Sequence, residues 1–260
     1  MFFSSLIRTT CLSVFLLPAA CTQTPMESSS AVAAEQRTAL DQANAADTSG
    51  YQLAAPQDPN GIGKYYQGRQ IAHVMGHEGA EWLERGDRQE EEGTDRLLRE
   101  LKLKPTDVVA DIGAGTGYFS FRISPLVPQG KVLAVDIQPE MVAYLRDHKD
   151  ANKAQNVEPI LGTVQNPNLP AGTVDMVLIV DAYHEFDHPR EMMRAIRNSL
   201  SPTGRVALVE YRAEDPNVPI KRIHKMTEAQ ARKELEALGL VFVENIKTLP
   251  QQHLLIFRRQ

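Results

Sequence analysis

The chain has 260 residues, of which 42% are hydrophobic, so it can form one substantial buried core together with a tail. Its formal net charge of -5 excludes a surface built to neutralise phosphates, and we expect no nucleic-acid partner. The local basic run of Lys221, Arg222, His224 and Lys225 is interpreted as a solvated face, with contact to an acidic substrate as the alternative.

The N-terminus has the features of an export signal. Arg8 is followed by an apolar stretch from Cys11 to Ala20 that is too short to span a bilayer. The segment 17–21, Leu-Pro-Ala-Ala-Cys, resembles a bacterial lipobox, which implies a signal peptide over residues 1–20 and a lipidated Cys21 as the first mature residue. We therefore expect a periplasmic lipoprotein tethered to the membrane. The alternatives are ordinary signal cleavage, which leaves a soluble periplasmic protein, and translation from Met26, which leaves a cytoplasmic one.

Two segments precede the main domain. Residues 22–60 are rich in small and polar residues and are predicted to be a flexible tether. Residues 61–93 carry aromatic residues between Tyr65 and Trp82 among many charges, and they are predicted to form one or two short helices that cover the main domain as a lid. His73 and His77 are spaced i and i+4 on such a helix; we interpret them as one helix face, with a metal site or an acceptor contact as the alternative.

Residues 94–260 alternate between strand and helix patterns, which predicts an α/β fold with a mostly parallel sheet. Continuous apolar runs are typical of strands that are covered on both faces, and they occur at 108–112, 132–135, 174–180 and 206–209. Helices are predicted at 118–126, 139–149 and 189–200, and another follows Thr227 and ends at Gly239. Two final strands are predicted at 240–246 and 253–257.

A glycine-rich loop lies where the first of these strands leads into a helix. The loop is Gly113-Ala114-Gly115-Thr116-Gly117, and glycines there let the backbone approach a ligand while the helix offers unpaired N–H groups. Asp136 ends the next strand, where its carboxylate can accept hydrogen bonds from the two hydroxyls of a ribose. Together the two features predict a ligand that contains adenosine.

The segment Asp111 to Gly117 resembles the first motif of class I S-adenosylmethionine-dependent methyltransferases, which has an acidic residue two positions before the first glycine. A dinucleotide fingerprint would need its third glycine at position 118, where Tyr118 stands. The resemblance covers residues 94–260. It implies a Rossmann-like seven-stranded sheet in the order 3-2-1-4-5-7-6, with S-adenosyl-L-methionine as cofactor, Asp111 near its methionine end and Asp136 at its ribose.

One segment departs from the family pattern. Many relatives have Gly-Asp-Ala after the third strand, where the acid binds the adenine amino group, but this chain has Gly162-Thr163-Val164. Either Thr163 and backbone groups make that contact or the cofactor binds less tightly. The residues that we predict to bind the cofactor are Asp111, Gly113, Ala114, Gly115, Thr116, Gly117, Asp136, Ile137, Thr163, Val164 and Asp181.

The segment after the fourth strand carries the candidates for acceptor chemistry. It lies at the carboxyl edge of the sheet, where open α/β sheets bind ligands, and family members that methylate small molecules often have a histidine there. We predict that His184, Tyr183 and Glu185 orient or deprotonate the acceptor, with simple packing as the alternative. The same residues spell His-Glu-x-x-His as far as His188, a zinc protease pattern, but Pro189 disfavours the helix that this pattern needs. We expect no metal ligand.

We therefore predict an S-adenosylmethionine-dependent methyltransferase that acts on an unidentified small molecule. An exported, non-catalytic binding module with the same fold is the first alternative, because a fold does not guarantee activity. An NAD(P)-dependent oxidoreductase is the second. Membrane contact is expected only through a lipid at Cys21, and the sequence does not indicate an oligomeric state.

Overall fold

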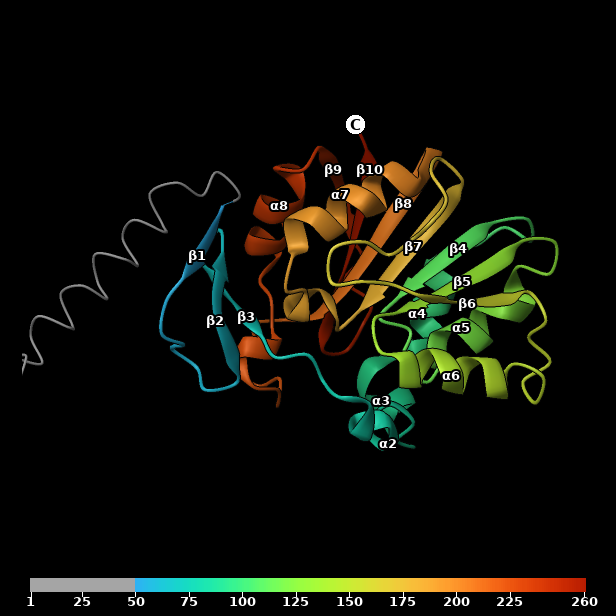
Figure 1. Ribbon diagram of the computed structural model, residues 1–260, viewed down its shortest axis with the longest axis horizontal. Helices are drawn as coiled ribbons and strands as arrows, with labels where there is room; N and C mark the ends of the chain where they lie inside the picture. Colours follow the sequence, from blue (N-terminus) through green and yellow to red (C-terminus); the bar gives the residue numbers. More distant parts are fainter. Residues whose placement is uncertain (1–49) are drawn as a thin grey trace, which may run out of the picture. The chain divides into compact units, whose positions relative to one another are not determined.

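The computed structural model describes residues 50–260 (Figure 1). The predicted signal peptide, Cys21 and residues 22–49 of the predicted tether lie outside the described residues. Among residues 50–260, no helix is both long and apolar enough to cross a membrane.

A seven-stranded sheet forms the centre of the described chain. Its order is β6-β5-β4-β7-β8-β10-β9, and all neighbours are parallel except β10, which runs antiparallel to β8 and β9. Counted from β4, this order reads 3-2-1-4-5-7-6; the labels differ because three strands that we did not predict precede β4. The strands are β4 Val108–Ile112, β5 Lys131–Asp136, β6 Val157–Leu161, β7 Val174–Val180, β8 Leu200–Tyr211, β9 Leu240–Asn245 and β10 Gln252–Arg259.

Helices cover both faces of this sheet (Figure 1). One face packs against α7 and α8 through residues such as Met193 and Leu235, and the other packs against α4, α5 and α6 through residues such as Leu97, Ile123 and Leu145. Burial on both faces is why the inner strands are continuously apolar. The helices are α4 Thr94–Glu100, α5 Tyr118–Ile123, α6 Pro139–His148, α7 Pro189–Ser199 and α8 Glu228–Glu236, with 3-10 turns η2 Ser124–Leu126, η3 Tyr183–Glu185 and η4 Arg222–His224.

Local signals fix where several helices begin, as the sequence predicts. Pro139 and Pro189 are the first residues of α6 and α7, a position where the missing N–H of proline costs nothing. The Oγ1 of Thr227 accepts a hydrogen bond from the Gln230 N–H at 3.0 Å, so Thr227 caps α8. The α/β Rossmann-like architecture that was expected for residues 94–260 is confirmed.

The prediction of helices at the start of residues 61–93 is wrong. A three-stranded antiparallel sheet lies there, made of β1 Tyr51–Leu53, β2 Gly61–Tyr66 and β3 Arg69–Ala72, and helical structure begins only with η1 His77–Gly79, α2 Ala80–Leu83 and α3 Arg88–Glu92. The two residues between β2 and β3, Gln67 and Gly68, have φ values of 49° and 93°. Positive φ at both positions is the signature of a tight hairpin turn.

Two further predictions about this region are also wrong. The predicted tether does not extend to residue 60, because β1 begins at Tyr51 and pairs with β2. His73 and His77 do not share a helix face, since His73 follows β3 and His77 lies in η1.

A buried ion pair joins the N-terminal sheet to the main domain. The Arg69 guanidinium donates to both carboxylate oxygens of Glu234 on α8, at 2.8 and 2.9 Å. It also donates to the backbone oxygen of His184 at 3.0 Å. The Tyr183 hydroxyl donates to Glu234 at 2.8 Å, so three segments of the chain meet at one carboxylate. This network fixes η3 relative to β3.

Candidate functional site

The glycine loop after β4 has a backbone that only glycine adopts easily. Gly113, Gly115 and Gly117 have φ values of 76°, 54° and 87°. A Cβ atom on Gly113 would lie 2.9 Å from the Ala182 Cβ, and one on Gly115 would lie 2.6 Å from the Leu83 Cδ1. The glycines therefore serve both the turn and the close approach of neighbouring segments.

Asp136 lies at the end of β5 beside this loop. Its two carboxylate oxygens accept hydrogen bonds from the Gly115 N–H and the Gln138 N–H, each at 2.9 Å. Burial raises the pKa of Asp136, and the backbone N–H groups of Gln138, Gly115 and Ile137 oppose that shift. A carboxylate has about four acceptor positions, so Asp136 keeps capacity for a hydrogen bond to a ligand.

A cavity of about 650 Å³ opens at the carboxyl ends of β4, β5 and β7. Its first part, the glycine-loop half, is lined by Gly113, Gly115, Asp136, Ile137, Gln138, Val164, Trp82 and Leu83. Its second part, the histidine half, is lined by His184, Glu185, Phe186, Asp187, His224, Ile220, His73, Val74 and Met75. Residues 73–75 thus line the histidine half, and Trp82 and Leu83 line the glycine-loop half. Neither Tyr65 nor Tyr66 reaches the cavity.

Eight of the predicted site residues line this cavity, and they come from both halves. These are Gly113, Gly115, Asp136, Ile137, Val164, Asp181, His184 and Glu185. Six do not line it: Asp111, Ala114, Thr116, Gly117, Thr163 and Tyr183.

Asp111 lies behind the glycine loop rather than in the cavity. It is buried, and its Oδ2 accepts a 2.6 Å hydrogen bond from the Ser120 hydroxyl on α5. Burial raises its pKa from the usual 3.8 to about 6, against the effect of Ser120 and Arg88. The role implied for Asp111, near the methionine end of the cofactor, stays a prediction; Asp111 does not line the cavity, and its hydrogen bond to Ser120 ties the end of β4 to α5.

Tyr183 and Thr163 are also placed away from the cavity. Tyr183 is fully buried in the core beneath α7 and α8, with its hydroxyl on Glu234. Thr163 is exposed, and its Oγ1 accepts hydrogen bonds from the N–H groups of Gln165 and Asn166, which closes a turn. Thr116 donates to Glu84 at 2.5 Å, so it holds the segment after α2 over the loop.

Asp181 is a partly buried residue with an unusual backbone conformation, directly after β7. Its φ is 48°, which is uncommon for a residue with a side chain. Its Oδ2 accepts a 2.6 Å hydrogen bond from the Gln252 amide, while Oδ1 has no partner among the described residues. Burial raises its pKa well above the usual value, and the carboxylates of Glu92 and Glu210 add to that shift.

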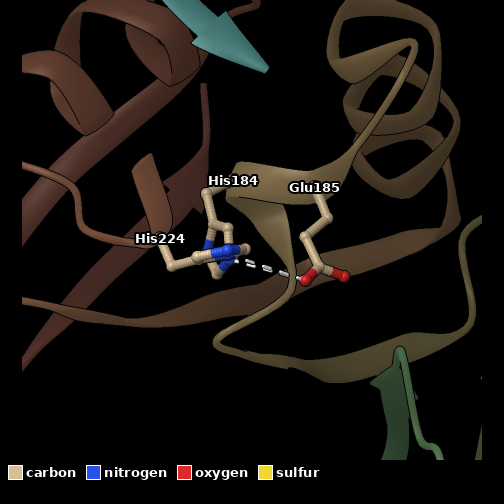
Figure 2. Close-up of side chains that lie close together, drawn as sticks. All are labelled: His184, Glu185 and His224. Carbon is tan, nitrogen blue, oxygen red and sulfur yellow. Dashed lines mark hydrogen bonds and ion pairs between the residues drawn. The ribbon is translucent and has the colours of Figure 1, made fainter. Parts of the chain in front are cut away.

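Four side chains converge in the histidine half of the cavity. The Nδ1 of His184 lies 2.7 Å from an oxygen of the buried Glu210, and its Nε2 lies 3.0 Å from the Nδ1 of His224. The Oε1 of Glu185 lies 3.7 Å from the Nε2 of His184 and 3.9 Å from the Nδ1 of His224. Figure 2 shows the Glu185 carboxylate turned toward the two imidazole rings.

The electrostatics of the two histidines differ. Burial lowers the pKa of His184, but the charges of Glu210 and Glu185 outweigh this effect and raise it. For His224, burial and the neighbouring His184 lower the pKa. His224 was missed by sequence reasoning, which placed it in a solvated basic run. In the sequence, His224 is only a histidine among basic residues, 40 positions after His184, and nothing nearby links the two.

Comparison with known proteins shows what part of this chain is similar to. Residues 109–204 match the family model described as a methyltransferase domain. An uncharacterised methyltransferase-like protein of Schizosaccharomyces pombe is 34% identical over 134 residues, which is 51% of this chain and 49% of that protein. An arsenite methyltransferase of Halobacterium salinarum is 30% identical over 107 residues, 41% of this chain and 27% of that one. The matches thus span about half or less of the length of these relatives.

Solved structures agree with this assignment at the level of the fold. A SAM-dependent methyltransferase from Aquifex aeolicus superimposes with a TM-score of 0.67 at 23% identity, covering 71% of this chain and 98% of that one. The YcgJ protein of Bacillus subtilis superimposes with a TM-score of 0.52, covering 64% and 97%. Neither the oxidoreductase nor the non-catalytic module is supported by these findings. Residues 109–204 are thus similar to a methyltransferase domain, and the fold that the chain shares with SAM-dependent methyltransferases implies S-adenosyl-L-methionine as cofactor.

Proposed function

We propose that this protein transfers the methyl group of S-adenosylmethionine to a small molecule that binds in the histidine half of the cavity. One observation carries the proposal: a single cavity runs from Gly115 and Asp136 to His184 and His224. Its volume of about 650 Å³ is within the range of small-molecule sites. Since the cofactor itself would occupy much of this volume, the acceptor has to be small or to extend out of the opening.

The glycine-loop half has the groups that the cofactor requires. The carboxylate of Asp136 would accept the two ribose hydroxyls, and the backbone of Gly113 and Gly115 would lie against the amino-acid end. Val164 is exposed beside the cavity and would pack against the adenine face. Asp111 would act indirectly, because it holds Ser120 and the start of α5 under the loop.

The histidine half would align the acceptor and exclude water. The bound cofactor supplies an activated methyl group, so the protein mainly has to fix the acceptor atom in line with it. Val74, Met75 and Ile220 provide apolar walls, and His184 and Glu185 provide the polar groups that would orient or deprotonate the acceptor. Tyr183 has no part in this proposal, since its hydroxyl is bound to Glu234 in the core.

Titration calorimetry of Asp136→Ala with S-adenosylmethionine tests the function. Loss of two hydrogen bonds to a charged group, at about 1.5 kcal/mol or more each, predicts binding weaker by roughly 100-fold or more. Glu158→Ala is a matched control, because Glu158 is an exposed carboxylate on the adjacent strand, paired with Lys131. Equal affinities for the parent and Asp136→Ala would remove the central assignment.

We also propose that the protein is exported and lipidated at Cys21, which lies outside the described residues. The support is the lipobox-like segment alone. Labelling of cells with a palmitate analogue should mark the parent and Cys11→Ala but not Cys21→Ala. Cleavage without label would indicate ordinary signal cleavage, and an unprocessed cytoplasmic protein would indicate translation from Met26.

A further inference from the structure

We propose that His184, Glu185 and His224 bind one divalent transition-metal ion of the zinc class, and that this ion holds the acceptor through an ionisable hydroxyl or thiol. The metal site follows from the side chains alone. The acceptor chemistry rests in addition on the proposed methyl transfer. The site differs from the His-Glu-x-x-His pattern in the sequence, because its second histidine is His224 and not His188.

The three ligand atoms have the spacing that one metal ion needs. The three distances among the Nε2 of His184, the Nδ1 of His224 and the Oε1 of Glu185 are 3.0, 3.7 and 3.9 Å. Bonds of about 2.0 to 2.2 Å to zinc place neighbouring ligands about 3.0 to 3.5 Å apart, depending on coordination number. A shift of a few tenths of an ångström in Glu185 therefore completes the set (Figure 2).

The groups behind the ligands hold them in the orientation that a metal requires. Glu210 is fully buried, and one of its oxygens lies 2.7 Å from the Nδ1 of His184 while the other accepts the His184 backbone N–H at 3.2 Å. A carboxylate on the far nitrogen is the usual partner of a metal-bound histidine, because it leaves the other nitrogen free to ligate. The Oε2 of Glu185 accepts the Met75 N–H at 3.1 Å, which leaves its Oε1 for the ion.

The charge of the cluster suits a divalent cation. Glu185 and Glu210 bring two carboxylates to two imidazoles, the Arg69 guanidinium is bound to Glu234 and to the His184 backbone oxygen, and Lys221 is the cation that lines the cavity near His224. Two histidines and one carboxylate are ligands typical of catalytic zinc, and such sites keep a further position open. All three ligands line the cavity, so the open position faces the space left for the acceptor.

The ion would allow methyl transfer to a weakly acidic acceptor. A hydroxyl or thiol that binds a divalent ion loses its proton to solvent near neutral pH. The lone pair of that oxygen or sulfur then forms a bond to the methyl carbon, the bond from carbon to the sulfonium breaks, and its electrons stay on the sulfur as a neutral thioether. No further oxidant, reductant or base is required.

Cobalt binding to the full chain tests the metal site. The chelator-treated protein is titrated with Co²⁺, and we expect a saturable visible absorption band at one ion per chain that Zn²⁺ abolishes. Glu210→Gln should weaken Co²⁺ binding by roughly 10- to 100-fold, because Glu210 only orients the ligand His184. His224→Ala should weaken Co²⁺ binding by more than this, because it removes a metal ligand itself. His224 is partly exposed on η4, so its replacement leaves the core intact, and thermal unfolding verifies this.

His188→Ala is the matched control, since it removes a nearby histidine that does not line the cavity. It should bind Co²⁺ as the parent does. The metal site is refuted if the parent shows no saturable band, if His224→Ala binds as tightly as the parent, or if His188→Ala loses binding as His224→Ala does.

The acceptor chemistry has its own measurement. Phenol and benzenethiol are added to the cobalt protein, with anisole and thioanisole as controls that have no ionisable proton. A change in the cobalt band with phenol or benzenethiol only supports the proposal, and no change with either overturns it. S-adenosylmethionine calorimetry on the same samples separates the two claims: cobalt binding without cofactor binding overturns the proposed methyl transfer and leaves the metal site standing.

Discussion

The two halves of the cavity are built in different ways. The glycine-loop half comes mainly from one stretch, in which Gly113 to Gly117 follow β4 and Asp136 ends the adjacent β5. The histidine half is assembled from η3, η4, β8 and residues 73–75, which are joined by contacts between positions as far apart as Met75 and Glu185. The glycine-loop half therefore depends mainly on backbone conformation, whereas the histidine half depends on buried contacts between segments that are distant in the sequence. Substitutions should therefore damage the two halves through different mechanisms.

The largest effect is expected at the ion pair that holds the histidine half together. Arg69→Met leaves the Glu234 carboxylate buried without its partner, which predicts a loss of about 3 to 5 kcal/mol in the free energy of unfolding. Urea denaturation measures this loss. Arg232→Met is the control on α8, the helix that carries Glu234, because the Arg232 pairs with Glu228 and Glu236 are partly or fully exposed and should contribute less than about 0.5 kcal/mol.

A double variant sharpens that prediction. Arg69→Met combined with Glu234→Gln removes the unpaired charge, so part of the lost stability should return. If Arg69→Met unfolds at the same urea concentration as Arg232→Met, the histidine half does not depend on this buried contact.

The next effect is a pH dependence in the support of the glycine-loop half. The pKa of Asp111 is raised from 3.8 to about 6, so its contribution to stability is complete below pH 4 and is lost as the pH rises through 6. Asp111→Asn stays neutral throughout. Its free energy of unfolding should therefore rise relative to the parent between pH 4 and 6, by up to about 3 kcal/mol. A difference that is constant from pH 4 to 7 would contradict the prediction.

A smaller effect should appear at the glycine loop itself. Gly113→Ala places a Cβ at positive φ and in contact with Ala182, which predicts a loss of about 1 to 3 kcal/mol and weaker binding of S-adenosylmethionine. Gly172→Ala is the matched control, because Gly172 has a similar φ of 69° with no atom within 4 Å of the added Cβ. Only the strain of about 1 kcal/mol is expected there, with cofactor affinity unchanged. Equal behaviour of the two variants would show that the contact with Ala182 has no effect.

The smallest effect is expected at a second link between the N-terminal sheet and the main domain. Lys64 lies 3.2 Å from Asp187, but the pair is partly exposed to solvent. Lys64→Ala should therefore cost less than about 1 kcal/mol, and the cost should shrink at high salt. A loss as large as that of Arg69→Met would mean that charge pairing of any kind, and not burial, holds the histidine half.

The sequence predicts the glycine-loop half better than the histidine half. The sheet, its flanking helices, the glycine loop and Asp136 depend on signals within a few residues of one another, such as apolar runs, Pro139, Pro189 and the cap at Thr227. Even here the role implied for Asp111, near the methionine end of the cofactor, stays a prediction, because Asp111 does not line the cavity. The family motif gives a position in the chain, but it does not show that Ser120 turns this carboxylate away from the cavity.

The histidine half could not be read from the sequence because its partners are distant. Nothing local to His224 indicates that η4 brings it to His184, and Glu210 appears only as one acidic residue in an apolar strand. The N-terminal hairpin was missed for a related reason. Its turn, Gln67-Gly68, is a weaker signal than the usual Asn-Gly, and aromatic residues among many charges suggested short helices that pack on the main domain.

The backbone of Met75 touches both halves of the cavity. Its N–H donates to Glu185, and its carbonyl oxygen accepts a hydrogen bond from the Gln138 side chain at 3.1 Å. One residue thus has a hydrogen bond to each half of the cavity. A ligand that moved Met75 in one half would change the energy of binding in the other half. If the proposed cofactor and acceptor act in this way, each would change the affinity of the other by the same factor, because thermodynamic linkage is reciprocal.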